Sequence, residues 1–159
     1  MLFIKKNFNI FNMTSSDIQK LREITGAGIM DCKKALEEAD GDMLKAQKIL
    51  EERGLEKAEK KSGRATGAGI IESYIHADRI GALIELRTET DFVAKSDPIK
   101  ILAKNIAMQI AAMGADSKES LLESSYIKDP TKTIKNLITE AITKVGENIQ
   151  IGQFYRIEL

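Results

Sequence analysis

Few residues in this 159-residue chain are suited to nucleophilic or acid–base chemistry. The chain has one cysteine, Cys32, and one histidine, His76, so these two form the one cysteine–histidine pair available to a thiolate mechanism. A single cysteine excludes an intrachain disulfide and a zinc site built from several cysteines. These counts favour a protein that works by binding. An enzyme with Cys32 as nucleophile and His76 as base stays open as an alternative.

The segment Glu85–Lys95, ELRTETDFVAK, could carry a binding site. Here a strand-like pattern ends and presents four residues: Thr90, Asp91, Phe92 and Val93. One interpretation makes Thr90 or Asp91 a helix cap and Phe92 a core residue. A helix start is clearer at Asp97-Pro98, which would leave Phe92 on a short connection beside a carboxylate. An aromatic and an acidic side chain at a loop tip are typical of a binding hot spot.

A second candidate is the segment Leu21–Leu36, LREITGAGIMDCKKAL. Arg22, Lys33 and Lys34 place positive charge at the end of one predicted helix and the start of the next. The two glycines between them permit a tight turn. By spacing alone, this is an ordinary helix–turn–helix core with solvated charges.

The chain divides into a helical part and a mixed part. Apolar residues at helical spacing predict three short helices within residues 14–54, the first capped by Ser16 or Asp17 and the third ending at Gly54. The segment 51–64, EERGLEKAEKKSGR, is rich in charge and has no apolar periodicity, so it predicts an exposed helical extension or linker, with residues 55–66 as the charged linker between the two parts. An RNA-binding alternative would use Lys60, Lys61 and Arg64 there.

Residues 67–159 predict an α+β module. Two alternating runs around Ala77-Asp78-Arg79 predict a hairpin. Helices are predicted from Asp97-Pro98, within residues 117–123 and from Asp129-Pro130. The predicted last strand places Ile149, Ile151, Tyr155, Ile157 and Leu159 on one face. The expected fold is a three-helix domain followed by a three-stranded, mostly antiparallel sheet covered by helices.

Composition narrows the function classes further. Lys plus Arg and Asp plus Glu each number 24, and this zero balance argues against a general nucleic-acid binder. A hydrophobic content of 43% is typical of a globular protein, and no apolar run is long enough for a membrane span. Residues 1–13 are interpreted as a leader or an over-long start, with Met13 as a possible true start.

Both candidate segments resemble the signature stretches of the elongation factor Ts family, the guanine-nucleotide exchange factors of elongation factor Tu. The first resemblance is carried by Leu21-Arg22, Thr25–Gly28 and Asp31–Leu36, and the second by Thr90–Lys95. Residues 145–149, VGENI, and 74–76, YIH, are also similar. Two departures stand before the second signature, Arg87 and Thr88, which we expect to alter the strand face and not the tip.

The resemblance implies that the chain binds the GDP form of elongation factor Tu, disturbs its magnesium and phosphate site, and promotes GDP release. It implies no cofactor of the chain's own, no catalytic residue, and no direct contact with nucleic acid or membrane. The implied partner-binding residues are Thr90, Asp91, Phe92, Val93, Arg22, Ile29, Met30, Lys33, His76, Val145 and Gly146.

Longer members of the family carry a further core subdomain or a helical insertion between the helices that here end near Met113 and begin near Thr131. The resemblance to short members therefore implies a homodimer. The expected compartment is a bacterial cytoplasm, with a mitochondrial matrix or plastid as the alternative. The remaining alternative function is a ubiquitin-binding-like helical module fused to an α+β interaction domain.

Overall fold

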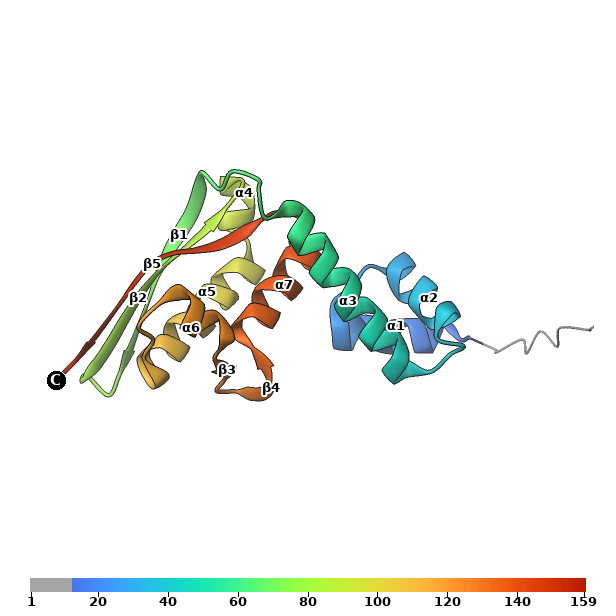
Figure 1. Cartoon of the computed structure of the whole chain (residues 1–159), viewed down its shortest axis with the longest axis horizontal. Helices are drawn as coiled ribbons and strands as arrows, with labels where there is room; N and C mark the ends of the chain where they lie inside the picture. Colours follow the sequence, from blue (N-terminus) through green and yellow to red (C-terminus); the bar gives the residue numbers. More distant parts are fainter. Residues whose placement is uncertain (1–12) are drawn as a thin grey trace, which may run out of the picture. The chain divides into compact units, whose positions relative to one another are not determined.

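The computed structural model describes residues 13–159, so the predicted leader, apart from Met13, lies outside the described residues (Figure 1). The chain forms two compact units, of which the first reaches to Arg53 and the second spans Gly54–Leu159. Each unit has its own hydrophobic core. The boundary between the units falls inside one helix, α3 (Met43–Lys61).

The first unit consists of α1 (Ser15–Thr25), α2 (Ile29–Glu38) and the first part of α3. The cap of α1 is Thr14, whose hydroxyl accepts a hydrogen bond from Asp17 N while the Asp17 carboxylate accepts one from Thr14 N. The predicted cap, Ser16 or Asp17, was therefore wrong, because Asp17 occupies the reciprocal position of a capping box. The buried core is small and is made of Leu21, Ala27, Cys32, Ala35, Leu36, Ala39, Ala46 and Leu50.

The third helix does not end at Gly54, as predicted, but continues to Lys61. Gly54 is buried, and a Cβ atom added to it would lie 3.3 Å from Thr143 Oγ1. The glycine thus serves a close approach between two helices rather than a helix stop. Much of the predicted linker, residues 55–66, is consequently helical, and Ala58 packs against the core of the second unit.

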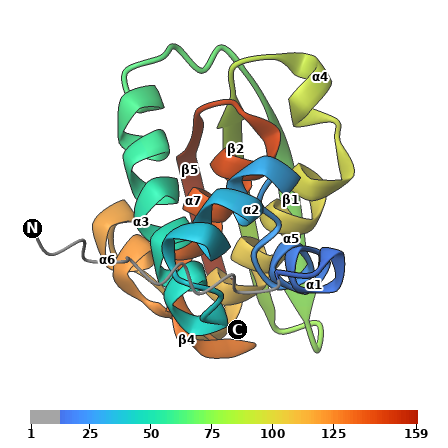
Figure 2. The same ribbon diagram turned by 90° about the vertical axis from the view of Figure 1, so that its right-hand side faces the viewer.

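The second unit is built on an antiparallel sheet in which β2 (Ile80–Thr88) lies between β1 (Ala68–His76) and β5 (Ile149–Glu158) (Figure 2). Helices α5 (Asp97–Met113) and α7 (Ile134–Val145) lie on one side of this sheet (Figure 1). Alternate residues of β2, namely Ala82, Ile84, Leu86 and Thr88, are buried beneath them. The predicted α+β fold, with helices covering one face of a three-stranded sheet, is confirmed.

The connection between α5 and α7 contains α6 (Lys118–Glu123) and a small hairpin of β3 (Ser125–Tyr126) and β4 (Asp129–Thr133). Asp129-Pro130 therefore opens a strand, and the prediction of a helix start there was wrong. The helix begins at Ile134, where the Thr133 hydroxyl accepts a hydrogen bond from Asn136 N and the Asn136 side chain accepts one from Thr133 N.

Strand β5 changes face partway along its length. Between the pairs Leu86–Ile151 and Ile84–Phe154, one residue of β2, Glu85, stands opposite two residues of β5, Gly152 and Gln153. This extra residue is a β-bulge, which moves every later side chain to the opposite face of the sheet. Ile149 and Ile151 are buried, whereas Tyr155 and Ile157 are exposed. The prediction that all of them share one face was wrong for this reason.

No helix within residues 13–159 is both long enough and apolar enough to cross a membrane.

Candidate protein-docking site

The clearest candidate site is the tip that follows β2, which consists of Thr90 and the short helix α4 (Asp91–Ala94). Thr90 caps this helix by accepting a hydrogen bond from Val93 N at 3.3 Å. Val93 and Ala94 are buried against the core, whereas 86% of the Phe92 surface is exposed. Phe92 is thus neither a core residue nor part of an irregular connection.

The tip is anchored on both sides of its exposed face. The Thr88 hydroxyl donates a hydrogen bond to Thr90 O at 3.0 Å, and the Ser96 hydroxyl donates one to Val93 O at 2.7 Å. Because Val93 is buried, its side chain fixes the tip from below and is not available to a partner. Thr88 is buried and contacts the tip, so the expectation that it affects the strand face alone was wrong.

The first unit presents a second exposed apolar surface at the start of α2. Ile29 and Met30 are 54% and 61% exposed. Arg22 near the end of α1 is also exposed, as is Lys33, which pairs with Glu37 at 3.9 Å. Two apolar side chains flanked by cations are suited to a protein surface that is apolar at its centre and acidic at its rim.

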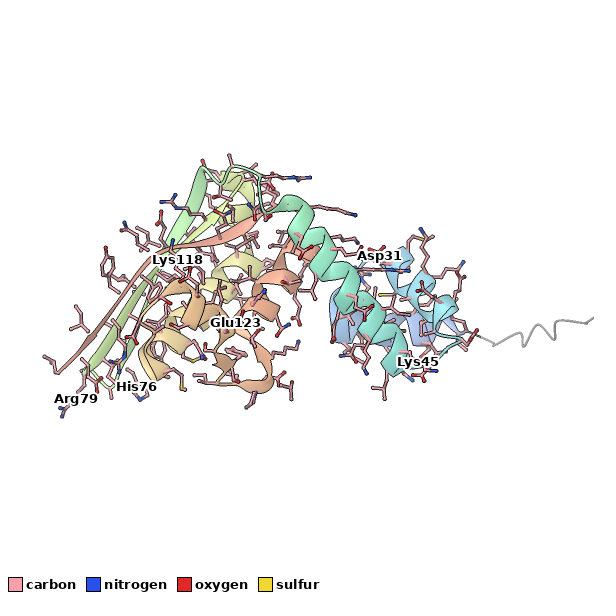
Figure 3. All side chains as sticks on the ribbon, in the orientation of Figure 1. Asp31, Lys45, His76, Arg79, Lys118 and Glu123 are labelled. Atoms are coloured by element: carbon pink, nitrogen blue, oxygen red, sulfur yellow. The ribbon has the colours of Figure 1, made fainter. Side chains whose placement is uncertain are left out.

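His76 lies away from the tip, at the end of the β1–β2 hairpin with Arg79 (Figure 3). Ala68, at the start of β1, pairs with Thr88, whereas His76 pairs with Ile80. The eight-residue step along an extended strand separates the two ends by about 26 Å. The His76 ring stacks on Tyr74, with Nδ1 3.3 Å from the Tyr74 hydroxyl. The structure therefore does not bring His76 to the tip.

The residues at the end of α7 lie close to the tip. Val145 is half-buried against the core, and Gly146 is exposed with φ of 82°, a left-handed conformation that favours glycine. The next residue, Glu147, forms hydrogen bonds with Thr90. Sequence reasoning included Glu147 in a signature stretch and gave it no role. The feature of the sequence that could have indicated a role for Glu147 is its position directly after a glycine that ends a helix.

The thiol that an enzyme would need is not well placed for nucleophilic attack. Cys32 is fully buried, and its Sγ donates a hydrogen bond to Ala27 O at 3.7 Å. Burial raises the pKa of the Cys32 thiol, which disfavours the reactive thiolate. Among the described residues, no group of three or more His, Cys, Asp or Glu side chains could hold a metal ion.

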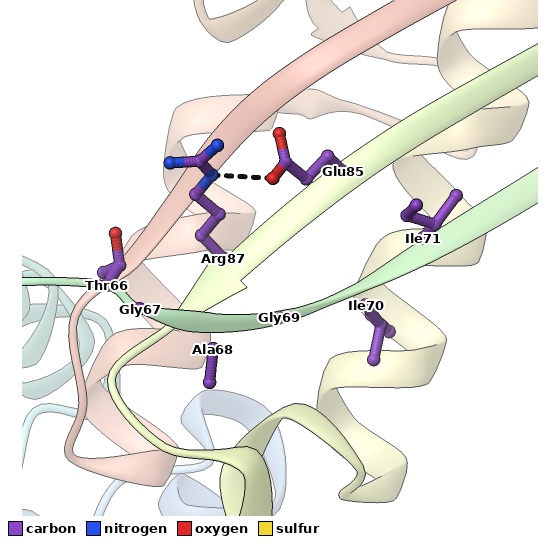
Figure 4. A pocket seen from close by; sticks show the side chains of 8 residues that line it. All are labelled: Thr66, Gly67, Ala68, Gly69, Ile70, Ile71, Glu85 and Arg87. Carbon is purple, nitrogen blue, oxygen red and sulfur yellow. Dashed lines mark hydrogen bonds and ion pairs between the residues drawn. The ribbon is translucent and has the colours of Figure 1, made fainter.

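An open pocket of about 580 Å³ lies beside the start of β1 (Figure 4). Its charged lining residues pair with each other, because Arg87 Nε donates to Glu85 Oε1 at 2.8 Å. Glu85 Oε2 accepts a hydrogen bond from Gln153 N at the bulge of β5. Arg87 thus acts on the exposed strand face. The lining consists of Thr66, Gly67, Ala68, Gly69, Ile70, Ile71, Glu85 and Arg87.

The tip carries an exposed aromatic side chain, and the first unit carries a separate apolar surface flanked by cations. Both features are typical of a protein that docks on another protein. The family model described as Elongation factor TS matches residues 89–159. Elongation factor Ts of Carboxydothermus hydrogenoformans is 43% identical over 193 aligned positions, which cover 92% of this chain and 89% of that protein. The chain belongs to the elongation factor Ts family, the guanine-nucleotide exchange factors of elongation factor Tu.

Further relatives show a similar relationship. Elongation factor Ts of Thermotoga maritima is 44% identical, covering 89% of this chain and 94% of that protein. Elongation factor Ts of Finegoldia magna is 40% identical, and the alignment covers 92% of this chain and 89% of that protein. Because 193 aligned positions exceed the 159 residues of this chain, at least 34 positions of the Carboxydothermus protein have no counterpart here. The alternative of a ubiquitin-binding-like module with an unrelated α+β domain is not favoured.

Proposed function

We propose that this chain binds the GDP form of elongation factor Tu and promotes GDP release by binding alone, without a covalent or acid–base step of its own. The observation that carries this proposal is Phe92, which is 86% exposed although the residues after it are buried. A large apolar side chain held in water on a fixed backbone is costly unless a partner covers it.

In the proposed mechanism, Phe92 inserts between helices of the partner's GTPase domain and shifts them. Asp91 precedes it at the start of α4 and reaches polar groups near the partner's magnesium ion. Magnesium requires near-ideal octahedral geometry, so a small displacement of its ligands weakens GDP binding. Each tenfold loss of GDP affinity needs about 1.4 kcal/mol of differential contact, and the coupling is reciprocal.

The first unit supplies the second part of the proposed docking surface. Ile29 and Met30 would be covered by the partner, with Arg22 and Lys33 contacting its acidic groups. His76 would make a separate contact, because it lies at the far end of β1 from the tip. Gly146 and Val145 support the tip through the residue that follows them.

Stopped-flow release of fluorescent GDP from elongation factor Tu tests this proposal. We expect Phe92→Ala to slow the maximal release rate by about 30-fold, the size of a hot-spot truncation near 2 kcal/mol. Met113→Ala is the matched control, because Met113 is also an exposed apolar side chain and lies at the opposite end of α5 from the tip. Release that is no faster with the wild-type chain than without it would refute the proposal.

We further propose that the chain forms a homodimer through the outer face of its sheet. This face carries exposed apolar residues on all three strands, and cross-strand partners place Leu83 opposite Tyr155. Gly81 stands between Ile75 and Ile157. The exposed apolar side chains of this face are Ile71, Ile75, Leu83, Tyr155 and Ile157. A second copy supplies the same apolar face, and the chain lacks at least 34 positions that a relative has.

Light scattering tests this assembly. The wild-type chain should give about twice the chain mass of 17.6 kDa. Leu83→Glu should give one chain mass, because a carboxylate would be buried between two apolar sheets. Met113→Glu places the same charge on α5 and should remain dimeric. A wild-type chain with the mass of one copy would exclude the homodimer.

We place the protein in a bacterial cytoplasm, since the relatives compared above are bacterial proteins. A mitochondrial matrix or plastid is the alternative. Immunolocalisation in the source cells distinguishes the two.

A further inference from the structure

Beneath the tip, a cluster of polar residues joins three segments that are far apart in the sequence. These are the end of β2, the connection between α7 and β5, and the turn that follows α3. We propose that Glu147, within this cluster, is a positioning residue for nucleotide exchange, because it holds the tip in the conformation that docks. This inference rests on the proposed function.

Glu147 binds the tip with both carboxylate oxygens. Thr90 N donates to Oε2 at 3.0 Å, and the Thr90 hydroxyl donates to Oε1 at 2.7 Å. Because the hydroxyl proton points to Glu147, the hydroxyl oxygen is left to accept from Val93 N and cap α4. A helix of four residues is too short to be stable by itself, so its conformation depends on such anchors.

A second set of contacts, made by Glu89, also fixes the connection between α7 and β5. Glu89 Oε1 accepts from Asn148 N at 2.6 Å and lies 3.5 Å from Arg64 Nη1. Glu89 and Thr90, which precede α4, thus bind Asn148 and Glu147, which precede β5. The backbone of one connection cannot move without breaking bonds to the other.

Asn148 fastens this pair to a third segment. Its side chain is buried and donates to Ser62 O at 3.2 Å and to Arg64 O at 2.9 Å. Gly146, with φ of 82°, reverses the chain after α7 and lets Glu147 and Asn148 face the tip. The glycine of this signature stretch therefore acts through its backbone conformation.

A mobile tip would lose conformational entropy when it docks, which would weaken binding. A tip that is already fixed does not lose this entropy. Without Glu147, Thr90 N and the Thr90 hydroxyl lose their acceptor, and the cap of α4 is free to rotate. We expect Glu147→Ala to lower the efficiency of GDP release about tenfold, the effect of losing hydrogen bonds to a charged group. Glu140→Ala is the matched control, because it removes a carboxylate from α7, the helix that precedes Glu147. Glu140 is exposed and pairs with Lys132 at 2.7 Å.

A double-mutant cycle separates positioning from general destabilisation. If Glu147 acts through Phe92, Glu147→Ala will have no further effect in a Phe92→Ala background. In the wild-type background, amide hydrogen exchange at Thr90 and Val93 should accelerate while exchange in β2 is unchanged. Glu147→Gln, which keeps one acceptor oxygen and the side-chain volume, should lose less activity than Glu147→Ala and provides the test if the alanine variant does not fold.

The outcomes distinguish this inference from the function on which it rests. If the wild-type chain does not accelerate GDP release, the proposed function fails. If Phe92→Ala is slow but both Glu147 variants match the wild type, the positioning role alone fails. Equal losses from Glu147→Ala with and without Phe92 would likewise overturn it, since the residue would then act elsewhere.

Discussion

Two exposed turns, one between α1 and α2 and the other at the tip, present apolar side chains in similar ways but are held in place differently. In the first turn, the Thr25 hydroxyl donates to Leu21 O at 2.7 Å and accepts from Ala27 N at 3.3 Å. Leu21 is four residues from Thr25 in the sequence, and Ala27 is two residues from it. At the tip, Thr90 and Glu147 are 57 residues apart.

This difference has a consequence for function. A turn built from neighbouring residues keeps its shape wherever its two helices form. The tip keeps its shape only while β2, α7 and β5 are packed together. Changes far away in the sequence should therefore affect the tip, whereas the turn between α1 and α2 should respond to changes in its own residues.

The largest expected difference between the two regions is kinetic. Phe92→Ala should lower the maximal rate of GDP release by about 30-fold, because the tip acts on the bound nucleotide. The double variant Ile29→Ala, Met30→Ala should raise the concentration for half-maximal release by about tenfold and leave the maximal rate unchanged, because this surface contributes uniform binding. Titrations with elongation factor Tu and fluorescent GDP measure both quantities. A lowered maximal rate in the double variant would contradict this division.

An intermediate effect is expected from the two glycines that end α1 and α7. Gly26 and Gly146 have φ of 67° and 82°, and no atom lies within 4 Å of a Cβ added to either. Alanine at each should cost about 1 kcal/mol of unfolding free energy, because the left-handed conformation is strained for a side chain. Urea denaturation measures this loss.

Gly26→Ala and Gly146→Ala should differ in their effect on nucleotide exchange. Gly146→Ala should also slow maximal GDP release by about threefold, since it displaces Glu147 from Thr90. Gly26→Ala should alter at most the concentration dependence. Equal losses of maximal rate in both variants would show that the two turns are not held differently.

The smallest expected effect concerns pH. Hydrogen bonds from Thr14 lower the pKa of Asp17 below 3.8, and those from Arg87 and Gln153 lower the pKa of Glu85 below 4.5. A lowered pKa in the folded state means that the stabilisation is complete above the unfolded pKa and is lost as the pH falls through the folded pKa. Asp17→Asn should therefore lower the midpoint of thermal unfolding at about pH 6 more than at about pH 3.

The Glu85→Gln variant extends this test to the second unit. It should show the same pH dependence, with the additional loss of the hydrogen bond to Gln153 N at the bulge. An Asp17→Asn midpoint that is lowered equally at both pH values would contradict the role of the ionised carboxylate.

Much of the local structure could be predicted because it depends on neighbouring residues. The predicted hairpin is formed by β1 and β2, and Ala82, Ile84 and Leu86, which alternate along the second of the two runs, form the buried face of β2. Asp42 caps α3 in the way that a short acidic residue before a helix favours, since its carboxylate accepts hydrogen bonds from Leu44 N and Lys45 N. In both cases the physical cause acts over a few residues, so the pattern is visible in the sequence.

Two of the errors share one cause, which is a contact between residues that are distant in the sequence. Gly54 does not end α3, because it packs against Thr143 and the helix continues past it. Tyr155 and Ile157 lie on the outer face because the bulge beside Glu85 adds one residue to β5. No local pattern distinguishes these cases from an ordinary helix stop or an unbroken strand.

The family, the α+β class and the candidate role of Phe92 can be inferred from the sequence, because signatures and periodicities are properties of short stretches. Tertiary structure alone decided that Phe92 projects from a capped helix, that Val93 anchors it, and that Glu147 holds Thr90. The physical reason is that a four-residue helix has no stability of its own. Its shape is supplied by burial and by hydrogen bonds from residues that only folding brings near.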